Sequence, residues 1–135
     1  MVLTSVTLLP SAQQAATASC AAPYLTSAEH LVLHPGRTVQ VDGAAFANGC
    51  HDTGSCSDTL GCTRCDNGPE PTPMLDITLS LQQHGRTWTL GTADARAAQD
   101  DLGAVTWAVV VPNGVERGEA TLVPEGGRPT KVTIR

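Results

Sequence analysis

The residues best suited to chemistry are five cysteines, four of which fall in one short segment. That segment runs Cys50-x5-Cys56-x5-Cys62-x2-Cys65, and the fifth cysteine, Cys20, lies upstream. In an oxidising compartment this density predicts disulfide bonds, which fix a loop that has no core of its own, mainly by restricting the unfolded chain. Five cysteines form at most two bridges, and sequence alone does not determine the pairing. We expect a Cys20–Cys50 bridge and a second bridge within Cys56, Cys62 and Cys65.

A metal site is the alternative use of the same residues. Cys62-x2-Cys65 is one half of a zinc knuckle, and His51 and Cys56, with Cys50 nearby, could supply the other ligands. Soft sulfur ligands would also suit Cu(I). A structural zinc site normally has two such cysteine pairs, whereas this chain has one, and no thioredoxin-like pattern surrounds the pair to favour a redox role. The prediction is therefore disulfides and no cofactor.

No combination of residues predicts catalysis. The four histidines are spread along the chain, and the nucleophile-elbow, zinc-protease and phosphate-loop motifs are absent. Asp100 and Asp101 form the one adjacent acidic pair, and with Asp94 they are an alternative calcium site, although a solvated turn is the simpler interpretation. Trp88 and Trp107 fall in alternating segments, which favours core packing over ligand stacking. We expect no catalytic residues and a protein that is not an enzyme.

Length and charge narrow the class of protein. A chain of 135 residues has room for one domain, and 13 acidic against 8 basic residues give a net charge of −5. The basic residues are scattered singly along the sequence, whereas nucleic-acid binding needs a clustered basic face. We therefore expect no nucleic-acid partner.

The N-terminal segment has the layout of a secretory signal. An apolar stretch over 2–9 is followed by a small-x-small triplet ending at Ala18, which predicts a signal-like segment over 1–18 that is cleaved after Ala18. Because no positive charge precedes the apolar stretch, a flexible N-terminal tail is the alternative. The stretch is too short to span a membrane. A lipid anchor at Cys20 fits poorly, because Thr17 stands where a lipoprotein signal has a large aliphatic residue.

The remaining residues predict short strands. Apolar and polar residues alternate in brief runs bounded by turn residues, and the segment 93–102 is either a loop or one or two helical turns. The expected strands are 31–33, 38–42, 75–81, 87–90, 105–111, 119–123 and 130–134. The expected inward-facing residues are Val39, Val41, Leu75, Ile77, Leu79, Leu81, Val105, Trp107, Val109, Val111, Leu122, Val132 and Ile134. About seven such strands predict an all-β, immunoglobulin-like sandwich over 19–135, with a long cysteine-rich loop inserted at 47–74.

Two groups of residues carry a resemblance to a known class of proteins. The first group is Cys20-x-x-Pro23, Pro35-Gly36-x-Thr38-Val39-x-Val41-x-Gly43-x-x-Phe46 and Cys50-x-Asp52, and the second is 90–95, Val109-x-Val111-Pro112 and Gly118-x-Ala120-x-Leu122. The chain from Cys20 onward resembles secreted immunoglobulin-like proteins of actinobacteria whose function is unassigned. The resemblance implies a fold and an extracytoplasmic compartment, and it implies no reaction.

Two functional hypotheses follow. The first is a secreted or cell-envelope interaction or structural module without catalytic activity, which uses loops at the end of a sandwich to meet a protein or glycan at the cell surface. The second is a small extracytoplasmic protein that binds zinc or copper, or performs thiol redox chemistry, through the cysteine-rich loop. The state of the sulfur atoms distinguishes them.

Overall fold

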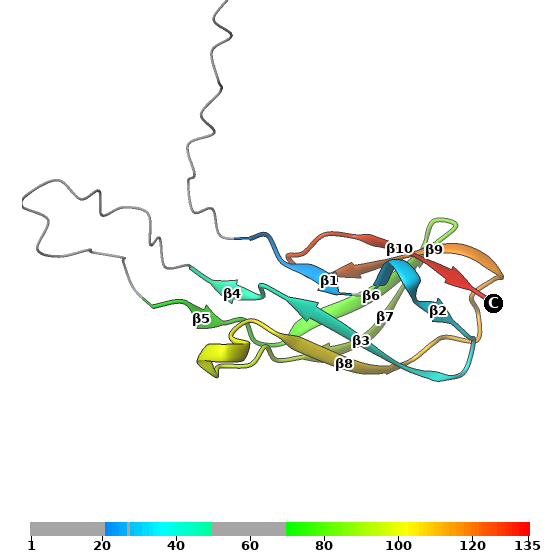
Figure 1. Cartoon of the computed structure of the whole chain (residues 1–135). Coiled ribbons are helices and arrows are strands. Elements are labelled where there is room, and N and C mark those ends of the chain that lie inside the picture. The colour runs from blue at the N-terminus through cyan, green and yellow to red at the C-terminus, as the bar shows by residue number, and fades with distance from the viewer. Residues whose placement is uncertain (1–20, 27, 50–69) are drawn as a thin grey trace, which may run out of the picture.

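A computed structural model describes residues 21–26, 28–49 and 70–135, and strands make up most of the regular structure in these ranges (Figure 1). The strands are β1 (Tyr24–Thr26), β2 (Val32–Leu33), β3 (Thr38–Ala44), β4 (Ala47–Asn48), β5 (Thr72–Pro73), β6 (Ile77–Gln83), β7 (Arg86–Ala93), β8 (Val105–Val110), β9 (Gly118–Pro124) and β10 (Thr130–Ile134). Two short 3-10 helices, η1 (Ala28–His30) and η2 (Gln99–Asp101), lie between them. Within the described ranges, no helix is long and apolar enough to cross a bilayer.

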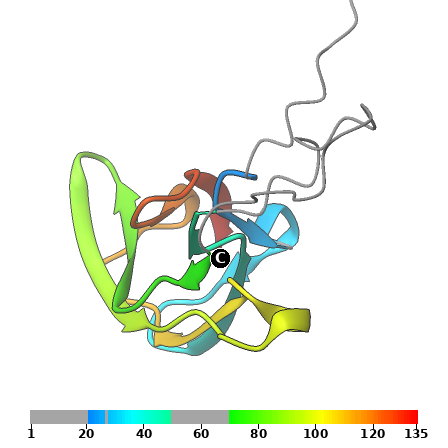
Figure 2. The same cartoon turned by 90° about the vertical axis from the view of Figure 1, so that its left-hand side faces the viewer.

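The strands form two main sheets and a small ribbon. One sheet has the order β1-β3-β8, the other has the order β2-β10-β9-β6-β7, and β4 pairs with β5. The pairing is antiparallel everywhere except between β2 and β10. Seen along the long axis, the two sheets curl around a common interior (Figure 2). The protein is all-β, and its layers are consistent with a β-sandwich.

Each of the seven expected strands has a counterpart, but the described residues contain ten strands. The three additional strands are β1, β4 and β5, which have two or three residues each. Segments this short cannot display a period of two, so the alternation that revealed the longer strands gave no signal for them. The expectation of about seven strands was wrong for this reason. The segment 93–102, which we expected to be a loop or a short helix, contains the single turn η2.

The expected core is confirmed with two exceptions. Leu75 is 65% exposed because β6 begins only at Ile77, and Asp76 before it has a positive φ of 52° that interrupts the alternation. Val39 is partly buried and packs against the core instead of lying inside it. The other inward residues that we expected are at most 5% exposed.

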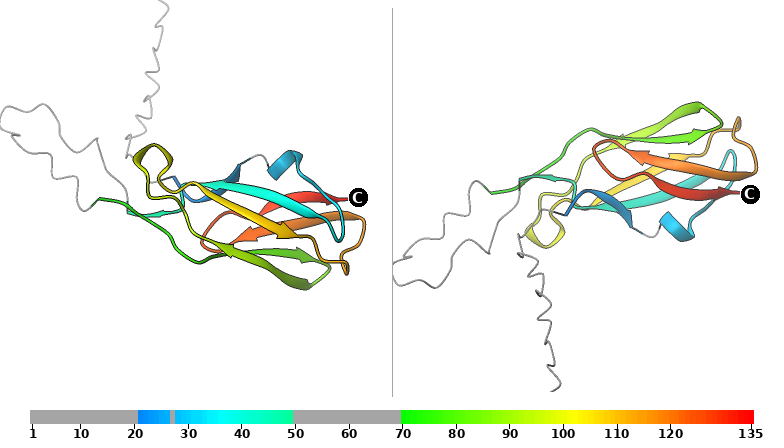
Figure 3. Two further views of the ribbon diagram at one scale, coloured as in Figure 1. Left: turned by 90° about the horizontal axis from the view of Figure 1, so that it is seen from below. Right: turned by 90° about the horizontal axis from the view of Figure 1, so that it is seen from above.

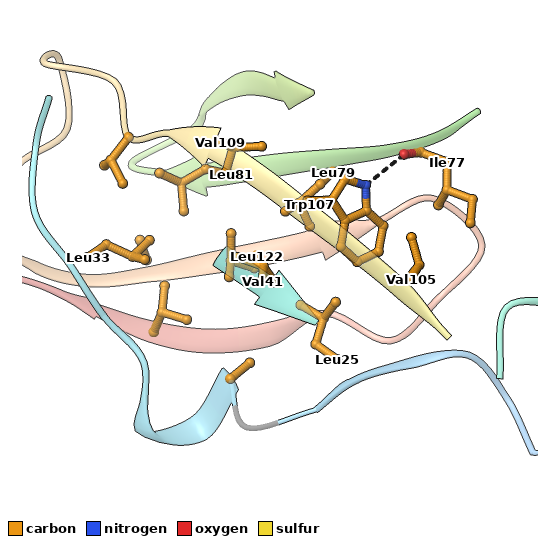
Figure 4. Close-up of a cluster of buried hydrophobic side chains, with 14 of the residues drawn as sticks. Leu25, Leu33, Val41, Ile77, Leu79, Leu81, Val105, Trp107, Val109 and Leu122 are labelled. Carbon is orange, nitrogen blue, oxygen red and sulfur yellow. Dashed lines mark hydrogen bonds between the residues drawn. The ribbon is translucent and has the colours of Figure 1, made fainter. Parts of the chain in front are cut away.

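Trp107 lies at the centre of the interior (Figure 4). It comes from β8 and is 1% exposed, and its indole Nε1–H donates a hydrogen bond of 2.9 Å to the carbonyl oxygen of Ile77 on β6. The bond therefore joins the two sheets and satisfies the polar atom of a buried aromatic side chain. The ring of Phe46 meets the Trp107 ring edge-on, with centroids 5.6 Å apart and an interplanar angle of 84°.

The sandwich has two dissimilar ends (Figure 3). The first, which we call the ribbon end, comprises the β4–β5 ribbon, the β7–β8 connection over 94–104, the β9–β10 turn over 125–129 and the chain that enters β1. The second, which we call the hairpin end, comprises the β2–β3 turn over 34–37, the β6–β7 turn over 84–85, the β8–β9 connection over 111–117 and Arg135. The described residues that border the cysteine-bearing segment, Gly49 and Glu70, lie at the ribbon end.

Candidate interaction site at the ribbon end

The β4–β5 ribbon begins at a kink after β3. Ala45 has a positive φ of 68°, and this conformation turns the chain out of the sheet and directs the next side chain, Phe46, into the interior, where it is 0% exposed. The ribbon then pairs Ala47 with Pro73 and Asn48 with Thr72. A proline is tolerated here because each strand of a two-stranded ribbon has an edge that needs no ladder hydrogen bond. The two stems of the insertion are thus held side by side at one point.

A closed ring of backbone hydrogen bonds anchors the ribbon to both sheets. The Met74 N–H donates to the Phe46 oxygen (3.0 Å), and the Phe46 N–H donates to the Gly103 oxygen (2.9 Å). The Gly103 N–H donates to the Arg96 oxygen (3.1 Å), and the Ala95 N–H donates to the Met74 oxygen (2.9 Å). Since Ala95 and Arg96 are consecutive, the four bonds close a ring of segments that extend β3, β6, β7 and β8. We call these four bonds the backbone ring.

Gly103 is required at its place in the backbone ring. Its φ is +84°, and a Cβ atom there would lie 3.0 Å from the Phe46 nitrogen and 3.3 Å from the Ala45 carbonyl carbon. Both neighbours are backbone atoms, which cannot rotate away as a side chain can. Glycine therefore allows the two corners to approach closely enough for the hydrogen bond to Phe46.

Polar side chains hold the β7–β8 connection to the outer face of the three-stranded sheet. Arg96 Nη2 donates to Thr106 Oγ1 (3.0 Å), and the Thr106 hydroxyl donates to Asp42 Oδ1 (2.8 Å). Gln40 Nε2 approaches both Asp42 carboxylate oxygens at 3.3 Å. The first two bonds link the β7–β8 connection to β8 and β8 to β3, so the connection is restrained from outside as well as by the backbone ring.

The surface of the ribbon end combines exposed apolar and acidic groups. Tyr24 is 41% exposed and Leu75 is 65% exposed, and both adjoin segments of the backbone ring. An open depression of about 410 Å³ lies between the residues just before β5 and those around η2, and its lining includes Glu70, Asp100 and Leu102. This end therefore presents apolar side chains, carboxylates and a shallow recess on loops fixed by backbone hydrogen bonds, a combination suited to contact with another molecule.

The sulfur chemistry that we expected falls outside the described residues. This holds for the disulfide candidates Cys20, Cys50, Cys56, Cys62 and Cys65 and for the alternative metal ligand His51. The bridges and the alternative metal site stay predictions. The structure does place the two stems of the insertion. The described chain ends at Gly49, just after β4, and begins again at Glu70, just before β5.

The carboxylates of the alternative calcium site are not brought together. In the parts of the chain that the structure describes, no three His, Cys, Asp or Glu side chains form a group that could hold a metal ion. Asp94 instead accepts a hydrogen bond of 2.8 Å from the Asp76 N–H, while Asp100 and Asp101 lie on η2. The solvated-turn interpretation suits Asp100 and Asp101, which are exposed.

No sequence pattern predicted the backbone ring. Its donors and acceptors are main-chain groups of residues with unremarkable side chains, and Phe46 follows a strand whose inward positions had already been assigned. Trp107 is buried, as expected, whereas Trp88 is only half-buried and lies under the Arg86 guanidinium, 4.8 Å from its ring centroid.

Comparison of the chain with protein-family models, with curated proteins and with solved structures finds no match.

Proposed function

We propose that this protein is a secreted or envelope-attached interaction or structural module that acts by binding and not by catalysis, with the ribbon end as its binding surface. The observation that carries the proposal is the backbone ring, which fixes both stems of the cysteine-bearing insertion to the two sheets at once. A long insertion held in this way is a loop on a rigid scaffold, the arrangement that binding surfaces commonly use.

The strand order supports an immunoglobulin-like assignment of the sandwich. With strands lettered from A to G, β1, β3 and β8 take the places of A, B and E, and β6, β9 and β10 take those of C, F and G. The insertion then lies in the B–C loop, and the β9–β10 turn is the F–G loop. In immunoglobulin variable domains these two loops belong to the end that binds antigen. The antibody hallmarks are not carried over, because β3 and β9 contain no cysteine and Trp107 lies on E instead of C.

The exposed side chains of the ribbon end support binding to a protein or glycan at the cell surface. Leu75 and Tyr24 expose apolar area beside carboxylates, and partner surfaces often combine an apolar centre with a polar rim. Leu75 follows Met74, which belongs to the backbone ring, so its main chain is already ordered before a partner arrives. Such ordering lowers the entropy that binding must overcome.

An extracytoplasmic compartment is part of the proposal. Its support is the signal-like segment over 1–18 together with five cysteines in 135 residues. Sequencing the N-terminus of protein recovered from outside the producing cells should find a chain that starts just after Ala18. Protein that is retained in the cytoplasm and begins with Met1 would refute this part.

The binding surface can be tested with two matched charge substitutions. Leu75 and Val110 are both exposed, at 65% and 57%, and neither is part of the buried core. We expect Leu75→Glu to weaken attachment of labelled protein to intact producing cells by about tenfold, the effect of about 1.4 kcal/mol. Val110→Glu, far from the ribbon end on β8, should leave attachment unchanged. Equal effects of the two substitutions would contradict the proposed surface.

Thiol titration with metal analysis of the purified protein tests the binding interpretation against the alternative. We expect one free thiol in the native protein and five after reduction, with no stoichiometric metal. One zinc or copper ion that stays with the protein through gel filtration would instead favour the metal-binding function.

A further inference from the structure

The β8–β9 connection at the hairpin end contains the dipeptide Asn113-Gly114. Both residues are exposed and lie on a turn between Val111, which is 1% exposed, and Val115, which is 7% exposed. An asparagine that precedes a glycine can lose its side-chain amide without an enzyme. The next main-chain nitrogen attacks the carboxamide, and glycine has no Cβ atom to obstruct the approach. The exposed turn is therefore a candidate site of chemical modification.

The two groups that must react are free of hydrogen bonds. Among the described residues, none is paired with the Asn113 carboxamide or with the Gly114 N–H. The main chain is fixed just before the turn, where the Val111 N–H donates to the Arg37 oxygen (2.9 Å) and the Val111 oxygen accepts from the Gly36 N–H (2.8 Å). The turn itself can therefore rotate toward the geometry of attack without breaking a hydrogen bond.

A second dipeptide of the same kind, Asn48-Gly49, provides an internal comparison. Asn48 lies on β4, where it pairs with Thr72 of β5, and Gly49 has a positive φ of 82°. The ribbon that contains Asn48 is tied to both sheets by the backbone ring. Because rotation of the Asn48 main chain would disrupt the ribbon, the same dipeptide should react more slowly there. The third such dipeptide, Asn67-Gly68, lies outside the described residues.

We propose that Asn113 is a site of spontaneous deamidation and that the folded protein favours it over Asn48. The Gly114 nitrogen gives its proton to hydroxide and forms a bond to Asn113 Cγ. The bond from Cγ to the side-chain nitrogen breaks, and its electron pair leaves with ammonia, which takes a proton from water and so regenerates the hydroxide. Water then opens the cyclic imide. Opening at the Cγ carbonyl gives aspartate, and opening at the main-chain carbonyl gives isoaspartate, in which the main chain continues through Cβ and Cγ.

The modification changes both the charge and the main chain of the hairpin end. The Asn113 side chain lies against the β2–β3 turn, since a Cβ atom at Gly36 would be 2.7 Å from Asn113 Oδ1. A negative charge therefore replaces a neutral amide beside this turn. Isoaspartate also lengthens the main chain by a carbon atom, in a segment whose flanking residues Val111 and Val115 are buried. The site is separate from the ribbon end, so it stands or falls independently of the function proposed above.

Peptide mapping of the intact protein during storage measures each asparagine separately. Trypsin places the three dipeptides in different peptides, 38–64, 65–86 and 97–117. The folded protein is incubated at neutral pH, and mass spectrometry of the digests follows the loss of each asparagine. We expect Asn113 to be lost at least about tenfold faster than Asn48, a difference of about 1.4 kcal/mol in the barrier. In protein unfolded by urea the two rates should become similar, because glycine follows both residues.

Gly114→Ala tests the chemistry without disturbing the fold. A Cβ atom at Gly114 would lie 3.8 Å from the Trp88 ring and 3.9 Å from Arg86 Nη1, which are ordinary contact distances, and Gly114 does not have a positive φ. We expect the substitution to slow the loss of Asn113 by about tenfold or more, because the added methyl group obstructs the attacking nitrogen. The rate at Asn48 should not change, and this constancy also shows that the variant is folded.

A pH series checks the attacking group. The rate at Asn113 should rise in proportion to the hydroxide concentration, because the Gly114 nitrogen attacks after losing its proton.

Three results would overturn the proposal. Persistence of Asn113 while Asn48 is lost would show that the turn protects its asparagine. Equal rates at the two residues in the folded protein would show that the ribbon and the turn do not differ in reactivity. An unchanged rate at Asn113 in Gly114→Ala would exclude the Gly114 nitrogen as the attacking group.

Discussion

The two ends of the sandwich are held together by different kinds of interaction. At the ribbon end, four main-chain hydrogen bonds close a ring that includes the main chain of Phe46, whose side chain is buried. At the hairpin end, two main-chain hydrogen bonds hold the start of the β8–β9 connection, joining Val111 to Gly36 and Arg37, and the side-chain amide of Gln83 holds the connection further along, at Glu116. Main-chain hydrogen bonds persist when an exposed side chain is substituted, whereas the hydrogen bonds of a side chain are lost when that one residue is substituted. The ribbon end can therefore vary its surface without losing its shape, which is what a binding surface requires.

The largest effect is expected where the ribbon enters the core. Phe46→Ala should lower the free energy of unfolding by about 3–5 kcal/mol, because it empties a fully buried site and removes the edge-on contact with Trp107. Urea denaturation followed by circular dichroism measures the change. Tyr24→Ala, a loss of an exposed aromatic side chain at the same end, is the control and should cost under about 1 kcal/mol. Similar losses for the two variants would show that Phe46 does not anchor the ribbon.

Substitution of one glycine at each end allows a direct comparison of the two ends. Gly103 and Gly85 have φ values of +84° and +76°, but a Cβ atom meets the Phe46 nitrogen at 3.0 Å in the first case and nothing within 4 Å in the second. Gly85→Ala should therefore cost about 1–2 kcal/mol from backbone strain alone. Gly103→Ala should cost at least about 1 kcal/mol more, since the backbone ring must also shift. If the two substitutions lowered the free energy of unfolding equally in the same denaturation experiment, the backbone ring would accommodate a Cβ atom at Gly103 without shifting.

The smallest of the three expected changes in the free energy of unfolding tests the Gln83 amide at the hairpin end. Gln83→Ala should cost about 1–3 kcal/mol, because it leaves the Glu116 N–H and the Glu116 oxygen without their partner. Gln82→Ala changes the same residue type one position earlier on an exposed site and should stay within about 0.5 kcal/mol of the parent. If Gln82 mattered as much as Gln83, the amide would not be the fixing element.

Most of the fold could be predicted from alternation, and the exceptions have local causes. The strands of five or more residues show a period of two, which places Ile77, Leu79 and Trp107 inside without knowledge of their partners. Leu75 fits the same pattern in the sequence, but the positive φ of Asp76 separates it from the strand. A dihedral angle set by a hydrogen bond to Asp94, 18 residues away, is not visible in a local pattern.

The candidate sites were harder to predict because they depend on contacts between distant segments. The backbone ring unites residues near 46, 74, 95 and 103, and main-chain groups carry no residue type to recognise. The Gln83 amide likewise bonds to the main chain at Glu116 and Glu119, which are 33 and 36 positions away in the sequence. The cysteines, by contrast, could be recognised as a candidate site from the sequence alone, because most of them are concentrated in one segment.

Native-state hydrogen exchange gives the most direct test of the ribbon end as a rigid platform. We expect the amides of Phe46, Met74, Ala95 and Gly103 to exchange only through global unfolding, with protection equal to that of the central strands β3 and β9. The Asp101 amide, which bonds within the single turn η2, should exchange by local opening and serves as the reference. If the four ring amides exchanged as fast as Asp101, the ribbon end would be a loosely attached loop and not a rigid platform for binding.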